Sequence, residues 1–373
     1  REISRKDSTK GKDLQITIDL RIQKYASNLL NLHKAGSIVL MNIENGNILC
    51  MTSNPTYDPN KIIKKPNKEY WDSILVNDLS PLTFRSVQGL YAPGSTFKMI
   101  VAIAAIYHGV IDINSKFACN GKIGLGERLY HCWKNNGHGM MNVDSALKES
   151  CDVFFYEISK KVGIDKISKV AQDFGLGKIY DIQIQNQKKG IIPSKKWKKE
   201  NLDENWYPGE TLISAIGQGF VLTNPLQLAT MTSIIASEGS FVTPNIIKKT
   251  SSNNFKKIDK YKSAIKIIKN SMFKVVNEKN GTAYKSKSEK FLFSGKTGTS
   301  QVRRITVAER ESDDFRKKEV EWKKRDHALF VGYMPSDKPK YAISVVIEHG
   351  GSGASAAAPI AKDIFQYVNE LNI

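Results

Sequence analysis

The stretch YAPGSTFKMIVAIAAI, residues 91–106, places a Pro-Gly turn, a serine and then a lysine at the start of a long apolar segment. A helix start would accept Ser95 as an ordinary N-cap, but Lys98 would then point into an apolar run. On a helix, S-x-x-K puts the lysine amine on the same face as the hydroxyl, one turn along and within its reach. A serine hydroxyl is a poor nucleophile until a base removes its proton. The stretch therefore predicts a nucleophilic serine with a lysine base.

Lys98 serves as this base only when it is neutral, so its pKa must fall from about 10.4 through burial and a second nearby cation. The apolar run MIVAIAAI predicts the burial. The S-x-x-K spacing alone is weak, because it also occurs at Ser145/Lys148, Ser263/Lys266 and Ser271/Lys274. Two further segments distinguish Ser95. These are ESCD, with Ser150 and Asp152, and SGKTGTS, with Lys296, Thr297, Gly298 and Thr299.

The composition is that of a globular protein with a strong positive charge. The chain has 373 residues, 40% of them hydrophobic, and 56 Lys and Arg against 37 Asp and Glu, a net charge of +19. This charge permits a polyanionic partner but does not establish one. The lysines lie in scattered clusters without an RNA-binding motif, so we expect no nucleic-acid partner. No run approaches the roughly 18 apolar residues of a membrane span.

The pattern along the chain predicts a single α+β domain. Strands are expected in the hairpin around Asn45-Gly46 and in residues 291–299, 327–334 and 341–348. Helices are expected after the N-cap Asp19 and over residues 97–111, 144–162, 164–174, 225–237 and 356–371. The terminal segments thus predict a mostly antiparallel central sheet flanked by helices. The middle of the chain, roughly residues 85–280, predicts an inserted all-helical subdomain.

Two charged segments lie outside this pattern. Residues 1–13 (REISRKDSTKGKD) have no hydrophobic periodicity, and we expect them to be the remnant of an N-terminal linker or pedestal that precedes a domain over residues 14–373. Residues 303–325 form a highly charged insertion, which we expect to be a solvated helix or loop.

S-x-x-K, a second motif beginning with serine, and K-T-G, in this order, are the signature of penicillin-binding proteins and class A β-lactamases. The sequence resembles the transpeptidase domain of class B penicillin-binding proteins, most closely the elongation-specific type 2 group. Further matching stretches are SNPTYDPN, GETLISAIGQGFVLTNPLQLA, KTGTSQ, HALFVGYMP and EHGGSGASAAAPIA. The resemblance implies the penicillin-binding and β-lactamase-like fold. It also implies a serine-type D,D-transpeptidase that cross-links peptidoglycan and is acylated by β-lactams.

The resemblance assigns a task to each motif residue. Ser95 would attack the penultimate D-Ala of a stem peptide while Lys98 takes its proton, and the backbone N–H groups of Ser95 and Thr299 would form the oxyanion hole. Ser150 would relay a proton to the leaving D-Ala, although a local structural role for this serine remains open. Lys296 would keep the region electropositive and help to keep Lys98 neutral.

At the substrate end, Thr297 and Thr299 would bind the terminal carboxylate, and Gly298 would let the peptide approach the strand. Asp152 stands where most relatives have asparagine. An anion there favours the charged form of Lys98, so we interpret Asp152 as a hydrogen-bonding and positioning group.

Three cysteines and a histidine fall in one segment with the spacing C-x12-C-x5-H-x12-C, namely Cys119, Cys132, His138 and Cys151. Three Cys and one His are a usual composition for structural zinc, and the resemblance implies a zinc site here because some type 2 relatives have one. A Cys119–Cys132 disulfide and plain buried thiols are the alternatives, and His131 is an alternative ligand. Cys50 is expected in the core.

The resemblance also implies the surroundings of the enzyme. We expect no organic cofactor, and as partners we expect stem peptides ending in D-Ala-D-Ala, β-lactams, a SEDS-family glycosyltransferase and elongation scaffold proteins. The expected location is the periplasmic face of the inner membrane, with an N-terminal anchor outside this sequence. A β-lactamase or β-lactam sensor is the first alternative, although no E-x-x-x-N lies between Ser150 and Lys296 to supply a deacylating glutamate. A non-catalytic polyanion-binding protein is the second.

Overall fold

A five-stranded antiparallel sheet forms the centre of the computed structural model, which describes residues 4, 7–63, 67–248, 256–303 and 320–372. Its strand order is β2-β1-β11-β10-β9, and every neighbouring pair is antiparallel. The five strands are β1 (Gly36–Asn42), β2 (Ile48–Asn54), β9 (Ser294–Ser300), β10 (His327–Met334) and β11 (Tyr341–Ile347). The two ends of the chain thus build one sheet, as the sequence predicted.

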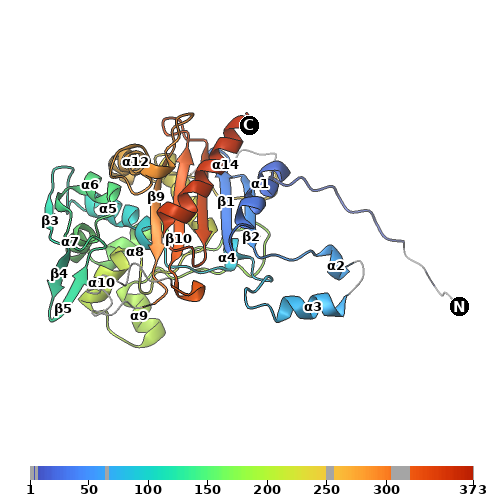
Figure 1. The fold of residues 1–373 in the computed structure, drawn as a ribbon, viewed down its shortest axis with the longest axis horizontal. Helices are drawn as coiled ribbons and strands as arrows, with labels where there is room; N and C mark the ends of the chain where they lie inside the picture. The colour runs from blue at the N-terminus through green and yellow to red at the C-terminus, as the bar shows by residue number, and fades with distance from the viewer. Residues whose placement is uncertain (1–3, 5–6, 64–66, 249–255, 304–319, 373) are drawn as a thin grey trace.

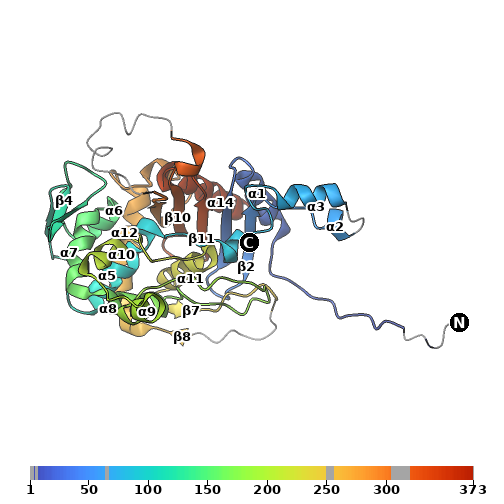
Figure 2. The same cartoon turned by 90° about the horizontal axis from the view of Figure 1, so that it is seen from below.

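Both faces of the sheet are buried, so alternate residues of one strand enter different cores. In β1, Ile38 and Leu40 join the core on one face, whereas Val39 and Met41 join the core on the other. Helices α1 (Leu20–Leu30) and α14 (Ala358–Glu370) cover the first face, and α11 (Pro225–Ala236) lies against the second (Figures 1 and 2). The sheet is therefore the middle of three layers.

The remaining elements lie beside the sheet or at its margins. The helices are α2 (Asn60–Ile63), α3 (Lys68–Leu75), α4 (Arg85–Gln88), α5 (Lys98–Tyr107), α6 (Val143–Lys148), α7 (Asp152–Val162), α8 (Ile164–Asp173), α9 (Lys195–Leu202), α10 (Pro208–Ala215) and α12 (Lys262–Asn277). Short 3-10 turns are η1 (Gly94–Thr96), η2 (Asp259–Tyr261), η3 (Tyr284–Ser286) and η4 (Trp322–Lys324), and η5 (Gly353–Ala357) is a π turn.

Helices α5 to α10 and α12 gather on the β9 side of the sheet, as the predicted helical insertion requires (Figure 1). The prediction that this region is all-helical is wrong, because it also contains two ribbons that the sequence pattern did not reveal. They pair β3 (Phe117–Cys119) with β6 (Gly139–Met141) and β4 (Lys122–Leu125) with β5 (Arg128–His131). A third ribbon pairs β7 (Ser240–Phe241) with β8 (Lys256–Lys257).

One predicted helix is broken where the site begins. The pattern predicted a continuous helix over residues 144–162, but α6 ends at Lys148 and α7 starts at Asp152. Ser150 adopts a left-handed φ of 59°, which no helix continues through. The break turns the Ser150 backbone toward β9, and this exposes a carbonyl and a hydroxyl to two lysines described below.

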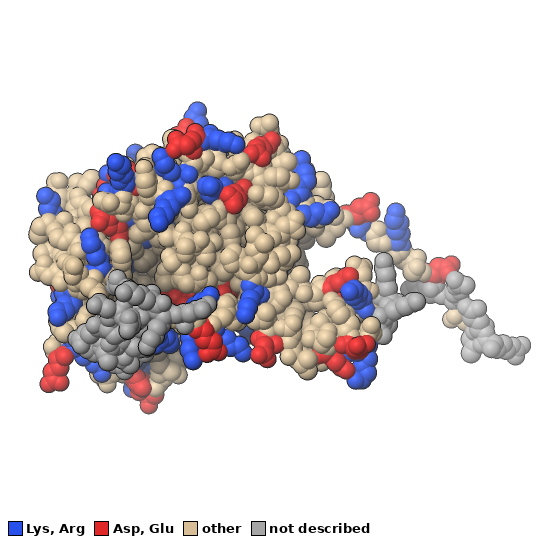
Figure 3. Space-filling view, viewed as in Figure 1, with Lys and Arg blue, Asp and Glu red and all other residues tan. Residues whose placement is uncertain are grey.

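The structure describes most of the charged N-terminal segment but only part of the charged insertion over residues 303–325. Residues 7–13 are exposed and extend away from the sheet (Figure 1). Most of the predicted insertion over residues 303–325 lies outside the described residues, and the described part contains η4. On the face shown in Figure 3, basic and acidic side chains are interspersed. Within the described ranges, no helix has the length and apolar character needed to span a membrane.

The half-buried His327 at the start of β10 makes stability depend on pH. Desolvation, and secondarily the neighbouring His349, lower the pKa of His327 to about 4. Between about pH 6.5 and pH 4, His327 is therefore protonated in the unfolded chain but neutral in the folded protein. Folding stability should fall as the pH drops through this range. We predict that the wild type loses about 2 kcal/mol more unfolding free energy than His327→Gln between pH 7 and pH 4.5. Denaturant unfolding at both pH values measures this difference.

The exposed His108 provides the comparison. Burial, and next Lys166 and Lys260, also lower the pKa of His108, but His108→Gln should remove a smaller part of the pH dependence than His327→Gln. Equal losses in the wild type and in His327→Gln would contradict the assignment.

Candidate functional site

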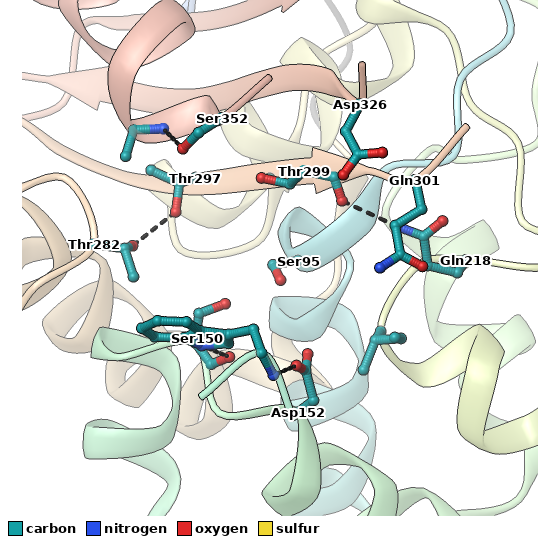
Figure 4. A pocket seen from close by; sticks show the side chains of 14 residues that line it. Ser95, Ser150, Asp152, Gln218, Thr282, Thr297, Thr299, Gln301, Asp326 and Ser352 are labelled. Atoms are coloured by element: carbon teal, nitrogen blue, oxygen red, sulfur yellow. Dashed lines mark hydrogen bonds between the residues drawn. The ribbon is translucent and has the colours of Figure 1, made fainter. Parts of the chain in front are cut away.

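A pocket of about 450 Å³ opens where β9, the η1 turn and the break between α6 and α7 meet (Figure 4). It brings together residues that are more than 200 positions apart in the sequence. Its lining residues are Ser95, Trp133, Ser150, Asp152, Ile216, Gln218, Thr282, Thr297, Gly298, Thr299, Gln301, Asp326, Ser352 and Ala354. All three predicted motifs therefore contribute to one cavity.

Ser95 lies in the middle of the η1 turn, just before α5, and faces the pocket (Figure 4). The N-cap of α5 is Phe97, and no side chain caps this helix start. The interpretation of Ser95 as an ordinary cap is therefore wrong. Its hydroxyl is half-buried and available to a molecule in the pocket.

Glycines allow the serine turn to pack against β9. A Cβ on Gly94, which has a φ of 54°, would lie 2.5 Å from the carbonyl oxygen of Thr299. A Cβ on Gly298 would lie 2.9 Å from the carbonyl oxygen of Pro93. Gly298 thus makes room for the serine turn. The sequence analysis had instead expected the missing side chain to make room for a bound peptide. This close packing places the backbone of Thr299 beside the residue that precedes Ser95.

Ser150 lies between two fully buried lysines. Lys98 Nζ donates to the Ser150 carbonyl oxygen at 2.8 Å and to Ser150 Oγ at 3.3 Å. Lys296 Nζ donates to the same Oγ at 3.1 Å and to the Thr297 carbonyl oxygen at 3.1 Å. Among the described residues, no hydrogen bond joins Lys98 to Ser95 Oγ. Lys98, the predicted base, therefore contacts the second motif in this state, and catalytic hydrogen bonds often tighten only when substrate binds.

Asp152 is the counter-ion of this cluster. Its Oδ1 accepts from Lys98 Nζ at 2.7 Å, and its Oδ2 accepts from the backbone N–H of Trp133 at 2.8 Å. Burial raises the pKa of Asp152, and the positive charge of Lys98 opposes this rise. The aspartate thus holds Lys98 in place, which agrees with the positioning role expected for it.

Lys296 has no carboxylate within ion-pair distance among the described residues. Burial, and next the charge of Lys98, hold the pKa of Lys296 well below its usual range. Two buried amines that share one hydroxyl repel each other when both are charged. The cluster therefore favours a state in which one of the two amines is neutral. In this arrangement that amine is Lys296, because Asp152 compensates the charge of Lys98.

The two threonines of the third motif continue the pocket along β9. Thr297 Oγ1 lies 2.7 Å from Thr282 Oγ1, and the carbonyl oxygen of Thr299 accepts from Gln218 Nε2 at 3.1 Å (Figure 4). Both hydroxyl-bearing side chains line the cavity. Because β9 is the last strand of the sheet, its free edge faces the pocket.

The four predicted metal ligands come together behind the pocket. The ligand atoms of Cys119, Cys132, His138 and Cys151 all lie within 4.8 Å of one another, and the three cysteines are buried. His131 is not one of the four. All four cysteines of the chain are free thiols, and Cys50 is in the core as predicted.

The spacing of these atoms fits a tetrahedral zinc site. His138 Nδ1 lies 3.6 Å from Cys119 Sγ and 3.5 Å from Cys132 Sγ. A tetrahedron with Zn–S of about 2.3 Å and Zn–N of about 2.0 Å has S–N edges of about 3.5 Å. A hydrogen bond from Cys151 lowers the pKa of the Cys132 thiol, which favours the thiolate form that zinc binds. The donor set therefore suits zinc.

The cysteine cluster also holds the second motif. Cys132 Sγ accepts from the backbone N–H of Asp152 at 3.3 Å, and Trp133 Nε1 donates to the Ser150 carbonyl oxygen at 3.1 Å. Cys151 points into the cluster although it is the N-cap of α7 and does not lie within a helix. Ser150 and Asp152, on either side of Cys151, line the pocket instead, and the break between α6 and α7 allows this division.

Sequence reasoning assigned no role to several residues of the pocket, because they lie outside the three catalytic motifs. These residues are Trp133, Ile216, Gln218, Thr282, Gln301, Asp326, Ser352 and Ala354. The position of Trp133 beside Cys132 was a usable signal. Five of these residues lie in matching stretches that assigned them no place. GETLISAIGQGFVLTNPLQLA contains Ile216 and Gln218, KTGTSQ contains Gln301, and EHGGSGASAAAPIA contains Ser352 and Ala354.

Comparison with known proteins gives a consistent result. The family model "Penicillin binding protein transpeptidase domain" matches residues 36–366. A relative named "Peptidoglycan D,D-transpeptidase MrdA" from Acinetobacter baumannii is 33% identical over 98% of this chain and 55% of its own length. The chain thus spans little more than half of the curated relatives it matches.

Two solved structures have the same fold. PBP2 of Pseudomonas aeruginosa in complex with WCK 5153 is 33% identical, with a TM-score of 0.85 over 97% of this chain and 76% of that one. PBP2 of Helicobacter pylori in complex with MreC is 32% identical, with a TM-score of 0.87 over 96% of this chain and 64% of that one. The predicted fold class is therefore confirmed.

Gly217 tests how strictly the serine turn is packed. Its φ is 69°, and a Cβ there would lie 2.1 Å from the carbonyl oxygen of Gly94. We predict that Gly217→Ala lowers the unfolding free energy by more than about 2 kcal/mol, because strain and a backbone clash add. Denaturant unfolding measures the loss.

Gly109→Ala is the matched control, since Gly109 has a similar φ of 66° but nothing within 4 Å of the added Cβ. It should cost only about 1 kcal/mol. Equal costs at the two positions would show that the contact with Gly94 is loose.

Proposed function

The chain belongs to the family of penicillin-binding protein transpeptidase domains, and on this premise we propose that it is a peptidoglycan D,D-transpeptidase that acts through a serine acyl-enzyme. The substrate is a stem peptide ending in D-Ala-D-Ala, and β-lactams acylate the same serine. One observation carries the proposal. A pocket-lining serine, Ser95, shares its cavity with Ser150, whose hydroxyl accepts from both buried lysines.

The first step forms the acyl-enzyme. Lys98 first passes its ammonium proton through Ser150 Oγ to the neutral amine of Lys296. Ser95 Oγ then attacks the carbonyl carbon of the penultimate D-Ala, and the neutral Lys98 accepts the hydroxyl proton. The backbone N–H groups of Ser95 and Thr299 stabilise the oxyanion, a contribution of about 3–4 kcal/mol per donor in other acyl-transfer enzymes. The packing of Gly94 against Thr299 supports this assignment, because it brings the two segments together.

The leaving group then needs a proton. Ser150 Oγ lies within hydrogen-bond distance of Lys98 and of Lys296, so it can pass the proton from Lys98 to the amine of the terminal D-Ala. The amide bond breaks, and an ester to Ser95 remains. An amine of a second stem peptide attacks this ester, forms the cross-link and returns the proton to Ser95. Asp152 holds Lys98 throughout.

The substrate is held by its end. Thr297 and Thr299 offer hydroxyl groups to the terminal carboxylate, and Lys296 lies next to them in the strand. Gly298 lets the serine turn approach this part of β9. These contacts select peptides with a free C-terminus, because an amide end would lose the charge-assisted hydrogen bonds.

We assign a zinc ion to Cys119, Cys132, His138 and Cys151 and propose no organic cofactor. When bound, zinc would be coordinated by these four side chains, with no open position, and would cross-link the segments that carry them. It would fix Cys151, and thereby the neighbouring Ser150 and Asp152, behind the pocket. The remaining steps belong to the protein's own side chains.

The cellular setting follows from the relatives. One solved relative is a complex of PBP2 with MreC. We propose that this chain acts at the periplasmic face of the inner membrane with an elongation scaffold protein and a SEDS-family glycosyltransferase, anchored by an N-terminal segment that lies outside this sequence.

Penicillin labelling tests the proposed reaction. We predict that a fluorescent penicillin adds one label per chain and that peptide mapping finds it on Ser95. Ser95→Ala should abolish labelling, whereas Ser263→Ala should label like the wild type, because the exposed Ser263 has the same S-x-x-K spacing but lines no part of the described pocket.

The adduct should persist, since the second reactant is an amine from another peptide. Rapid loss of the label would instead indicate a β-lactamase. Absence of any label from folded protein would exclude a penicillin-reactive serine and leave polyanion binding as the alternative.

Metal analysis tests the zinc assignment. We predict close to one zinc per chain, and its loss in the double variant Cys132→Ser, His138→Ala, with a drop in unfolding free energy of at least about 3 kcal/mol. Penicillin acylation should weaken in parallel, since Cys132 also holds Asp152. Cys50→Ala should keep its zinc. Metal-free native protein with four titratable or paired thiols would refute the assignment.

A further inference from the structure

Tyr91 lies four residues before Ser95 and takes no part in the reaction steps. It is buried, with an exposed fraction of 5%, and it lines no part of the described pocket. Its backbone N–H and carbonyl oxygen pair with Thr223 at 2.9 Å each. Its hydroxyl donates to Glu348 Oε1 at 2.6 Å, and its ring packs edge-on against His327, with the two centroids 5.5 Å apart. The start of the serine segment thus contacts three other parts of the chain.

Both partners of the Tyr91 side chain belong to segments that build the pocket. Glu348 follows β11 and leads into the η5 turn, whose N-cap Ser352 lines the cavity (Figure 4). His327 begins β10, the strand that pairs with β9. The two segments are also joined to each other, because the backbone N–H of His349 donates to His327 Nδ1 at 2.9 Å. One side chain therefore links the serine segment to two walls of the pocket.

Arg85 holds the carboxylate of Glu348 in place. The same oxygen, Oε1, accepts from Arg85 Nε at 2.8 Å, and the Arg85 side chain is buried. The other two guanidinium nitrogens donate to the carbonyl oxygens of Leu79 and Ser80. All three nitrogens of the planar guanidinium are thus bonded, which leaves it little freedom to turn. Glu348 therefore offers Tyr91 a fixed acceptor.

The surroundings of Tyr91 fit a protonated hydroxyl. A Cβ on Gly89 would lie 2.5 Å from Tyr91 Oη and 2.8 Å from the carbonyl oxygen of Arg85, so glycine makes room for the phenol. Burial, and next the charge of Glu348, raise the pKa of Tyr91 well above its usual range. The hydroxyl therefore keeps its proton near neutral pH and forms a charge-assisted hydrogen bond with the carboxylate.

The reaction requires such a restraint on the serine segment. Acyl transfer proceeds when the reacting atoms lie about 3–3.5 Å apart, and a misplacement of about 1 Å costs up to about 100-fold in rate. The serine turn packs on β9 through Gly94 and Gly298, which have no side chains to hold it. Tyr91 adds a directional polar contact that this glycine packing lacks.

We propose that Tyr91 is a positioning residue, which sets the place of Ser95 relative to β9 and η5 through its hydrogen bond to Glu348. This inference rests on the proposed transpeptidase function and adds a residue that touches neither the substrate nor the reacting atoms. Tyr91 therefore acts on the rate constant of acylation within the bound complex. Ligand affinity stays nearly unchanged, because Tyr91, Glu348 and Arg85 are not among the lining residues of the described pocket.

Acylation kinetics with a fluorescent penicillin test the inference. The dependence of the labelling rate on penicillin concentration gives the dissociation constant of the non-covalent complex and the rate constant of acylation within it. Tyr91→Phe removes one hydroxyl and keeps the ring beside His327. We expect its acylation rate constant to fall about fivefold to twentyfold. Its dissociation constant should stay within about twofold of the wild type, because no contact with the ligand is lost.

Tyr180→Phe is the matched control. Tyr180 is also buried, and its hydroxyl donates to the carbonyl oxygen of Gly175 at 2.6 Å. A Cβ on Gly175 would lie 2.4 Å from this hydroxyl, much as at Gly89. Each variant loses one buried hydrogen bond and should unfold more easily. Acylation of the folded protein should slow in Tyr91→Phe and keep the wild-type rate constant in Tyr180→Phe.

Two replacements of Glu348 test the acceptor. Glu348→Gln and Glu348→Leu both remove the charge, but only glutamine keeps an oxygen for Tyr91 and Arg85. We expect Glu348→Gln to be acylated within about threefold of the wild-type rate constant, and Glu348→Leu to slow as much as Tyr91→Phe. Tyr91→Phe leaves the ion pair with Arg85 intact, so it decides the question even where a Glu348 variant does not fold.

The outcomes separate this inference from the proposed function. A Tyr91→Phe protein with an acylation rate constant within about twofold of the wild type would overturn the role of Tyr91. A loss confined to the dissociation constant, or to the fraction of chains that label, would overturn it as well. In each of these cases, acylation of Ser95 in the wild type would still support the transpeptidase. A wild type that penicillin does not acylate would overturn the proposed function, and this inference with it.

Discussion

The ion pair between Lys98 and Asp152 is the interaction on which the rest of the site depends. Its Nζ and Oδ1 atoms lie 2.7 Å apart, and the lysine side chain is completely buried. Removing two charges from water costs several kcal/mol per ion, and their attraction recovers this cost only when the geometry is good and further hydrogen bonds are present. Here Trp133 and the Ser150 carbonyl supply those bonds. The pair is therefore poor support for stability, and its value lies in holding an amine at a defined place beside Ser150.

The surrounding fold supplies what the pair requires. The apolar side chains of α5 and α7 bury Lys98. The left-handed conformation of Ser150 interrupts the helix between α6 and α7, so that the Ser150 carbonyl and hydroxyl contact two amines. Backbone-to-backbone packing at Gly94 and Gly217 brings the serine turn against β9. The cysteine cluster fixes the other side of Ser150 through Cys151. Each device restricts one segment of the pocket, so the site arises from three distant parts of the chain.

Much of this arrangement could be predicted from the sequence, because hydrophobic period and motif order are local signals. The hairpin at Asn45-Gly46 and the strand over residues 327–334 are present as predicted. The break at Ser150 was missed, since its cause is a tertiary contact with Lys98 and Lys296 and not a local breaker residue. The β3/β6 and β4/β5 ribbons were missed because strands of three or four residues carry little periodicity. Asp326 follows a charged segment and belongs to no motif, so only the register of β10 places it in the pocket.

The central claim is that the buried pair is kept for chemistry and not for stability, and a double-mutant cycle tests it most directly. Unfolding free energy and the rate constant for penicillin acylation are measured for Lys98→Met, Asp152→Asn and the double variant. The account predicts that removing one charge alone costs about 3–5 kcal/mol and that the double variant regains most of this loss. It also predicts that acylation stays at least about 100-fold slower than in the wild type whenever Lys98 is replaced. A double variant that is acylated at nearly the rate of the wild type would contradict the account.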